Sequence, residues 1–94
     1  MGVRDKGYKY YGITDDEAKK LEAWCRVRNI DDDKLLLECA YEIKPELALD
    51  IFYSLTTNIS YDKLCSKKYI PINRFDFYGY RRATLARLKE KIRS

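Results

Sequence analysis

Apolar residues recur at helical spacing along most of this 94-residue chain, and no segment shows sustained alternation of apolar and polar residues. Helical spacing places apolar side chains on one face of a helix, whereas a half-buried strand requires strict alternation. A chain of this length can bury one modest core and is too short for two. We therefore expect an all-α fold, a compact bundle of about five helices, with residues 13–94 as a single domain.

Helix-start signals mark where these helices begin. Thr14 is followed three residues later by Glu17, which is the spacing of a capping box. The carboxylates of residues 31–33 favour a helix N-terminus over a calcium loop, because the alternate spacing and the glycine of such a loop are absent. The third segment, residues 46–55, is apolar on most sides, so we expect it at the centre of the core. Further start signals are Pro45, Ser60 and Asn73.

Composition excludes several classes of protein. Hydrophobic residues make up 46% and charged residues 36%, which is typical of a folded soluble protein. No apolar run approaches the roughly 20 residues that cross a bilayer, so we expect a cytoplasmic protein without a membrane partner. The chain has no histidine, and its three cysteines form no CxxC pair, which indicates reduced thiols. We therefore expect no enzymatic activity, no metal site and no cofactor.

The net charge of +4 is unevenly distributed along the chain. Residues 29–59 carry seven acidic and two basic side chains, whereas residues 60–94 carry ten basic and three acidic ones. This asymmetry indicates one face that meets polyanions and another that does not.

The segment after Asn73 reads as a basic amphipathic helix. Arg81 falls inside its apolar arc, where it needs either a carboxylate from the acidic middle helices or a change of helix direction near Gly79. Gly79 destabilises a helix by about 1 kcal/mol relative to alanine. A glycine at this position would be explained if another backbone segment or a phosphate approached the helix closely there. The residues expected to face the core are Phe77, Tyr78, Leu85, Leu88 and Ile92.

Residues 60–92 follow the order short helix, turn, longer basic helix, which is the order of a helix-turn-helix motif. Leu64 and Cys65 occupy positions where such motifs place a leucine and a small residue. The turn is about two residues longer than usual. It also contains Pro71, and Tyr69 stands where glycine is common. The alternative is an amphipathic helix that packs on the core and exposes its bases to solvent.

The motif assigns two sets of DNA-binding residues. Outward side chains in the first turns of the last helix would enter the major groove, and basic side chains around them would hold phosphates. The first set is Asp76, Tyr80 and Ala83, with Arg74 reaching round from the start of the helix. The second set is Lys63, Lys67, Lys68, Arg82 and Arg87. Residues 1–12, which mix bases with tyrosines, would form a flexible arm that tracks a groove, or would fold back on the domain.

The C-terminal half contains the pattern Ser-Tyr, a leucine, Ile-Pro, and then a helix that begins Arg-x-x-Phe-Tyr-x-Tyr-Arg-Arg. The residues that form it are Ser60, Tyr61, Leu64, Ile70, Pro71, Arg74, Phe77, Tyr78, Tyr80, Arg81, Arg82, Leu85 and Leu88. In this pattern the chain resembles a group of small prophage-borne proteins of Gram-positive bacteria. The resemblance implies a phage context and, by analogy with sigma-factor-like phage regulators, transcriptional control in the host cytoplasm.

Two hypotheses follow from these patterns. The first is a phage-encoded helix-turn-helix protein that binds double-stranded DNA through its C-terminal basic helix and regulates transcription. The second is a protein-interaction module, such as a phage inhibitor of a host enzyme or a small assembly factor. In that case the acidic residues 29–59 and the tyrosine-rich surface would form the contact. A homodimer is compatible with either hypothesis, although no heptad seam demands one.

Overall fold

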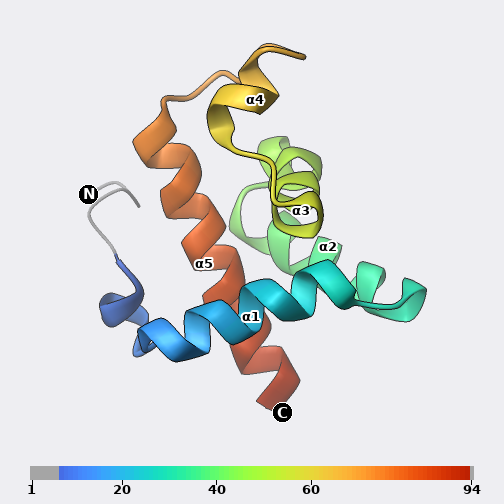
Figure 1. Cartoon of the computed structure of the whole chain (residues 1–94), viewed down its shortest axis with the longest axis vertical. Helices are drawn as coiled ribbons and strands as arrows, with labels where there is room; N and C mark the ends of the chain where they lie inside the picture. Colours follow the sequence, from blue (N-terminus) through green and yellow to red (C-terminus); the bar gives the residue numbers. More distant parts are fainter. Residues whose placement is uncertain (1–6, 94) are drawn as a thin grey trace.

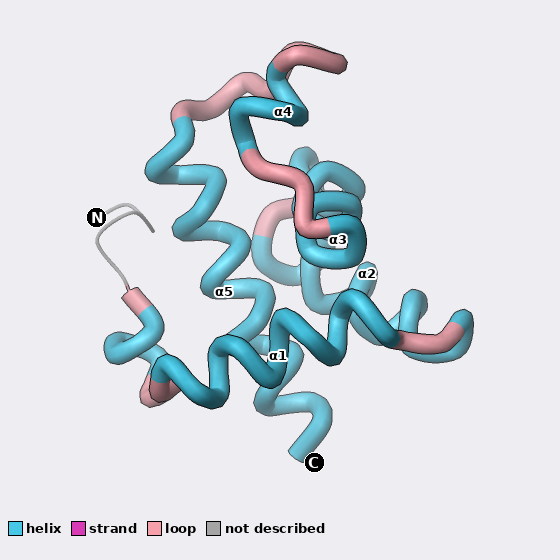
Figure 2. The backbone as a smooth tube through the Cα atoms, viewed as in Figure 1, coloured by secondary structure: helices cyan, strands magenta, loops and turns pink. Residues whose placement is uncertain are grey.

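The structure is a computed structural model that describes residues 7–93. Within this range the chain forms helices joined by turns and no strand, so the expected all-α bundle is confirmed (Figure 1; Figure 2). The elements are η2 (Tyr8–Tyr11), α1 (Asp15–Val27), α2 (Ile30–Ile43), η3 (Pro45–Leu47), α3 (Ala48–Thr57), α4 (Tyr61–Cys65) and α5 (Arg74–Arg93), of which η2 and η3 are short 3₁₀ turns.

Two helices, α3 and α5, each pack against every other α-helix, and η2 also packs against α5. The long α5 runs through the molecule, with α1 crossing its C-terminal half and α4 lying near its N-terminal end (Figure 1). Completely buried side chains of α5, including Phe77 and Leu85, meet Leu36 of α2 and Ile51 of α3 in one core. The core therefore combines the apolar third segment with the last helix.

The helix starts are made by side chains that bond backbone N–H groups. In the capping box of α1, the Thr14 hydroxyl accepts from the Glu17 N–H and the Glu17 carboxylate accepts from the Thr14 N–H, both at 3.1 Å. A second capping box opens α2, where Asn29 accepts from the Asp32 N–H at 2.9 Å. The carboxylates of residues 31–33 lie in the first turn of α2, where their negative charge interacts favourably with the positive end of the helix dipole.

The later helices also begin as predicted, but α4 is short. Ser60 accepts from the Lys63 N–H at 3.2 Å, and Asn73 accepts from the Asp76 N–H at 2.9 Å. Pro45 starts the 3₁₀ turn η3, which continues directly into α3. Because α4 ends at Cys65, the connection to α5 spans residues 66–73.

Several burial predictions for individual side chains were wrong. Ile92, expected in the core, is 45% exposed, because it lies in the last turns of α5 where the bundle ends. The third segment does form part of the core, although its Leu49 is 62% exposed and α3 therefore has one solvent-facing side. Ala83, expected to face outward, is only 8% exposed. Arg81 pairs with Glu22 at 3.9 Å, so its carboxylate comes from α1 and not from the acidic middle of the chain.

All three cysteines are free thiols, with Cys25 and Cys39 buried and Cys65 exposed. In the part of the chain that the structure describes, no helix is long and apolar enough to cross a membrane. Across the same residues, no group of three or more acidic or cysteine side chains is placed to hold a metal ion.

Candidate nucleic-acid interface

Most of the cations in the second half of α5 are bound to carboxylates of the same chain. Arg87 donates to Glu42 of α2 at 3.2 Å, and Lys91 contacts the same carboxylate at 2.9 Å. On the other side of the helix, Lys89 pairs with Glu17 of α1 at 2.9 Å. The acidic and basic segments of the sequence are therefore partly used to hold α1 and α2 against α5.

Electrostatic coupling at this contact favours the charged form of each partner. Hydrogen bonds from Arg87 and Lys91 lower the pKa of Glu42. The same carboxylate raises the pKa of Arg87 and the pKa of Lys91, in each case mainly through its hydrogen bond. A polyanion that approached this part of α5 would compete with Glu42 for both cations.

A different set of basic residues gathers around α4. Lys63 lies on α4 itself, Lys67 and Lys68 follow in the turn, and Arg74 opens α5. Arg74 is tied to α4 because its Nη2 donates to both carboxylate oxygens of Asp62, at 2.8 and 3.0 Å. This end of the molecule lies away from the C-terminus (Figure 1). We call Tyr53, Lys63, Lys67, Lys68, Tyr69 and Arg74 the α4 surface.

The turn after α4 is held over α3. Lys68 Nζ lies 2.9 Å from a carboxylate oxygen of Asp50, a residue only 9% exposed. The Lys67 ammonium lies 5.9 Å from the centroid of the Tyr53 ring, which is within the range of a cation–π contact. Among the described residues neither Lys63 nor Lys67 makes an ion pair, so both ammonium groups are available to an anion.

Buried contacts beneath α4 fix its position on α5. The Tyr61 N–H donates to the Tyr78 hydroxyl at 3.0 Å, and the Tyr61 hydroxyl donates to the Ile72 carbonyl. Leu64 and Ile70 are both buried against the core. The lysines of the α4 surface therefore project from a supported element, which limits the entropy lost on binding.

The structure divides the DNA-binding residues expected from the sequence into two groups. Lys63, Lys67, Lys68 and Arg74 come together in the α4 surface. Arg87 lies elsewhere: thirteen residues beyond Arg74 on the same helix, it is roughly 20 Å away at a rise of 1.5 Å per residue. Arg82 is half-buried within α5.

The residues expected to enter the major groove are largely covered. Ala83 is buried, and Asp76 and Tyr80 are half-buried, so the prediction of an outward face was wrong for Ala83. Tyr11 and Ile43 flank Tyr80 and Ala83 in a shallow pocket of about 330 Å³. This face of α5 is covered because η2 and α2 both pack on it.

The aromatic members of the α4 surface were not assigned a role from the sequence. Tyr69 is 83% exposed, and Tyr53 of α3 is 40% exposed. The sequence signal for Tyr69 was its position directly after Lys67 and Lys68, outside any helix. The proximity of Tyr53 to Lys67 depends on tertiary packing and had no local signal.

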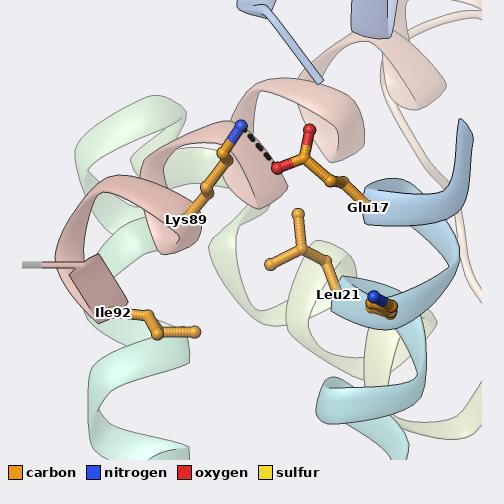
Figure 3. Close-up of a pocket in the computed structure, with 5 residues that line it drawn as sticks. Glu17, Leu21, Lys89 and Ile92 are labelled. Atoms are coloured by element: carbon orange, nitrogen blue, oxygen red, sulfur yellow. Dashed lines mark ion pairs between the residues drawn. The ribbon is translucent and has the colours of Figure 1, made fainter. Parts of the chain in front are cut away.

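A second concavity lies between α1 and the end of α5 and is almost entirely apolar. Leu21 and Ile92 face one another across it, and the Glu17–Lys89 ion pair lies at its rim (Figure 3). Its volume of about 180 Å³ is below the range of roughly 300–1,000 Å³ that small-molecule sites usually have. It is therefore a gap between two helices rather than a site for a cofactor.

No protein-family model, no curated protein and no solved structure matches this chain.

Proposed function

We propose that this chain is a DNA-binding protein that holds phosphates with the α4 surface. The observation that carries the proposal is that Lys63 and Lys67 project ammonium groups without an ion pair among the described residues, beside Lys68 and Arg74. Lysines placed on phosphates release condensed counterions, which supplies most of the affinity for DNA without regard to sequence. The α4 surface therefore suits the backbone of a nucleic acid.

In this proposal α5 supports the binding surface and does not read bases. On its expected reading face Ala83 is buried and Tyr80 is half-buried, and the connection of residues 66–73 is longer than the three or four residues of an ordinary helix-turn-helix. Phosphate contacts position a protein on DNA but carry little sequence information. In the phage setting that the sequence resemblance implies, such a protein would act in transcriptional regulation or another DNA transaction.

The test is fluorescence anisotropy with a labelled random DNA duplex across a salt titration. We compare the wild type with a Lys63→Ala/Lys67→Ala variant and with an Arg87→Ala/Lys91→Ala variant, which removes the same charge from the other end of α5. Each lost phosphate contact lowers the slope of log affinity against log salt by about 0.9. In the Lys63→Ala/Lys67→Ala variant the slope should fall by nearly twice this amount, whereas the Arg87→Ala/Lys91→Ala control should keep the wild-type slope. Absence of binding by the wild type at low salt to both the duplex and its separated strands would refute the proposal.

A protein-interaction module is the second candidate, and one observation favours it. Val27 and Ile30 are 81% and 85% exposed on either side of the α1–α2 junction. The acidic segment is less available than the sequence suggested, because five of its seven carboxylates are in ion pairs: Asp33, Glu38, Glu42, Glu46 and Asp50. A contact would therefore centre on the apolar junction.

This candidate is tested by capture from nuclease-treated host lysate with the wild type and an Ile30→Asp variant. A specific partner that the variant fails to retain would support the module. If the two proteins retain the same material, the junction is not an interface.

A further inference from the structure

The α4 surface combines its lysines with an aromatic ring that the fold leaves in water. Tyr69 is 83% exposed, although the next residue, Ile70, is buried. Among the described residues the Tyr69 side chain makes no hydrogen bond and no ring contact. The buried Ile70 thus holds the backbone beside Tyr69 while most of the Tyr69 side chain remains exposed to solvent.

A second ring lies on the same surface. Tyr53 is 40% exposed on α3, and the Lys67 ammonium lies 5.9 Å from its ring centroid. Leu49, one turn earlier on the same side of α3, is 62% exposed. The lysines after α4 are therefore bordered by aromatic and apolar surface, and the buried carboxylate of Asp50 is already neutralised by Lys68.

Duplex DNA cannot use these rings, because its bases are stacked on one another and only their edges are reachable in the grooves. A groove-reading helix would be required to reach those edges, and on the corresponding face of α5 Ala83 is buried and Tyr80 is half-buried. A single strand offers both phosphates and open base faces. Cationic side chains interleaved with exposed aromatic rings are the pattern that binds such strands.

We propose, on the basis of the function proposed above, that the α4 surface prefers single-stranded DNA, with an unpaired base stacked on Tyr69 and its neighbouring phosphates held by Lys67 and Lys63. Tyr53 provides a second, partly covered ring for the adjacent base. The interaction is tolerant of sequence, since every base has a face that can stack.

The experiment measures anisotropy of a labelled oligothymidylate of about 12 nucleotides and of the same strand annealed to its complement. Four proteins are compared: the wild type, Tyr69→Ala, Tyr69→Phe and Tyr41→Ala. Tyr41 is the matched control because it is an exposed tyrosine, 46% accessible, on α2 and outside the α4 surface. Circular dichroism verifies that each variant is folded.

The wild type should bind the single strand at least about 10-fold more tightly than the duplex. Tyr69→Ala should lose about 10-fold in affinity for the single strand and little for the duplex, whereas Tyr69→Phe and Tyr41→Ala should match the wild type. Equal, salt-sensitive binding of both DNAs, or a Tyr69→Ala loss that is the same for both, would overturn the single-strand preference and leave the proposed function intact. If neither DNA binds, both proposals are refuted.

Discussion

Arg87 of α5 donates a hydrogen bond from Nε to Oε2 of Glu42 at 3.2 Å, joining two residues that are 45 positions apart in the chain. Lys91 contacts the same carboxylate at 2.9 Å, so one acidic side chain of α2 serves two cations one turn apart on α5. A carboxylate of the acidic segment, residues 29–59, thus holds α2 against two cations of the basic segment, residues 60–94. Its contribution should depend on pH.

Replacing Glu42 with glutamine should lower the free energy of unfolding at pH 7 and remove part of its acid dependence. The pKa of Glu42 is lowered in the folded protein by Arg87 and Lys91, so the carboxylate stabilises the fold fully above the ordinary glutamate value of 4.5. This contribution is lost as pH falls through the lowered pKa. Urea titrations from pH 7 to pH 3 should show the wild type and the variant converging.

An Arg87→Ala/Lys91→Ala background provides the control for that experiment, since the effect of Glu42→Gln should shrink there if the three residues act together. A difference in stability that persists unchanged at pH 3 would show that the variant acts by another route.

Two neighbouring phenylalanines should respond very differently to truncation. Phe77 is completely buried in the core, whereas Phe75 is 66% exposed at the start of the same helix. Phe77→Ala should cost about 3–5 kcal/mol of unfolding free energy, because it removes a large apolar side chain and leaves a cavity. Phe75→Ala should change it by less than about 0.5 kcal/mol. Urea denaturation measures both, and similar losses would contradict the position of Phe77.

The capping box of α1 can be tested at Thr14. Thr14→Ala removes the oxygen that accepts from the Glu17 N–H and should cost about 1 kcal/mol of unfolding free energy. Thr14→Ser keeps that oxygen and should remain close to the wild type. Chemical denaturation of the three proteins provides the comparison, and equal losses in both variants would count against the cap.

The three thiols should separate into one fast and two slow classes towards a thiol reagent at pH 8. Burial raises the pKa of Cys25 to about 12 and the pKa of Cys39 to about 11, so neither forms much thiolate in the folded protein. Cys65 is exposed and should react first. Cys65→Ser should abolish the fast phase, and denaturant should release the other two thiols. Three equally fast thiols in the native protein would contradict this arrangement.

The sequence predicted features that depend on neighbouring residues. The capping box at Thr14, the caps at Ser60 and Asn73 and the turn at Pro45 are all local, and the structure confirms them. The number and class of the helices followed from the same signals and from the spacing of apolar residues.

Features that depend on which helices meet could not be predicted. A helical wheel places Ala83 outside the apolar arc, but it takes no account of η2 and α2, which cover that side of α5. Likewise, nothing near Arg81 in the chain indicates that its partner is Glu22 of α1. The candidate site was predictable for its lysines, which cluster in sequence, and not for Tyr53, which reaches Lys67 only through the packing of α3.

The position of α5 in the chain has a consequence for biosynthesis. Every other α-helix packs against α5, yet α5 follows all of them in the order of synthesis. Helices α1, α2 and α3 can pack against one another before that, but the apolar surface that they bury against α5 stays open until α5 has left the ribosome, so the core closes late. A stalled or prematurely ended message that stops within α5 would release a chain with an open core, which is a target for chaperones and proteases.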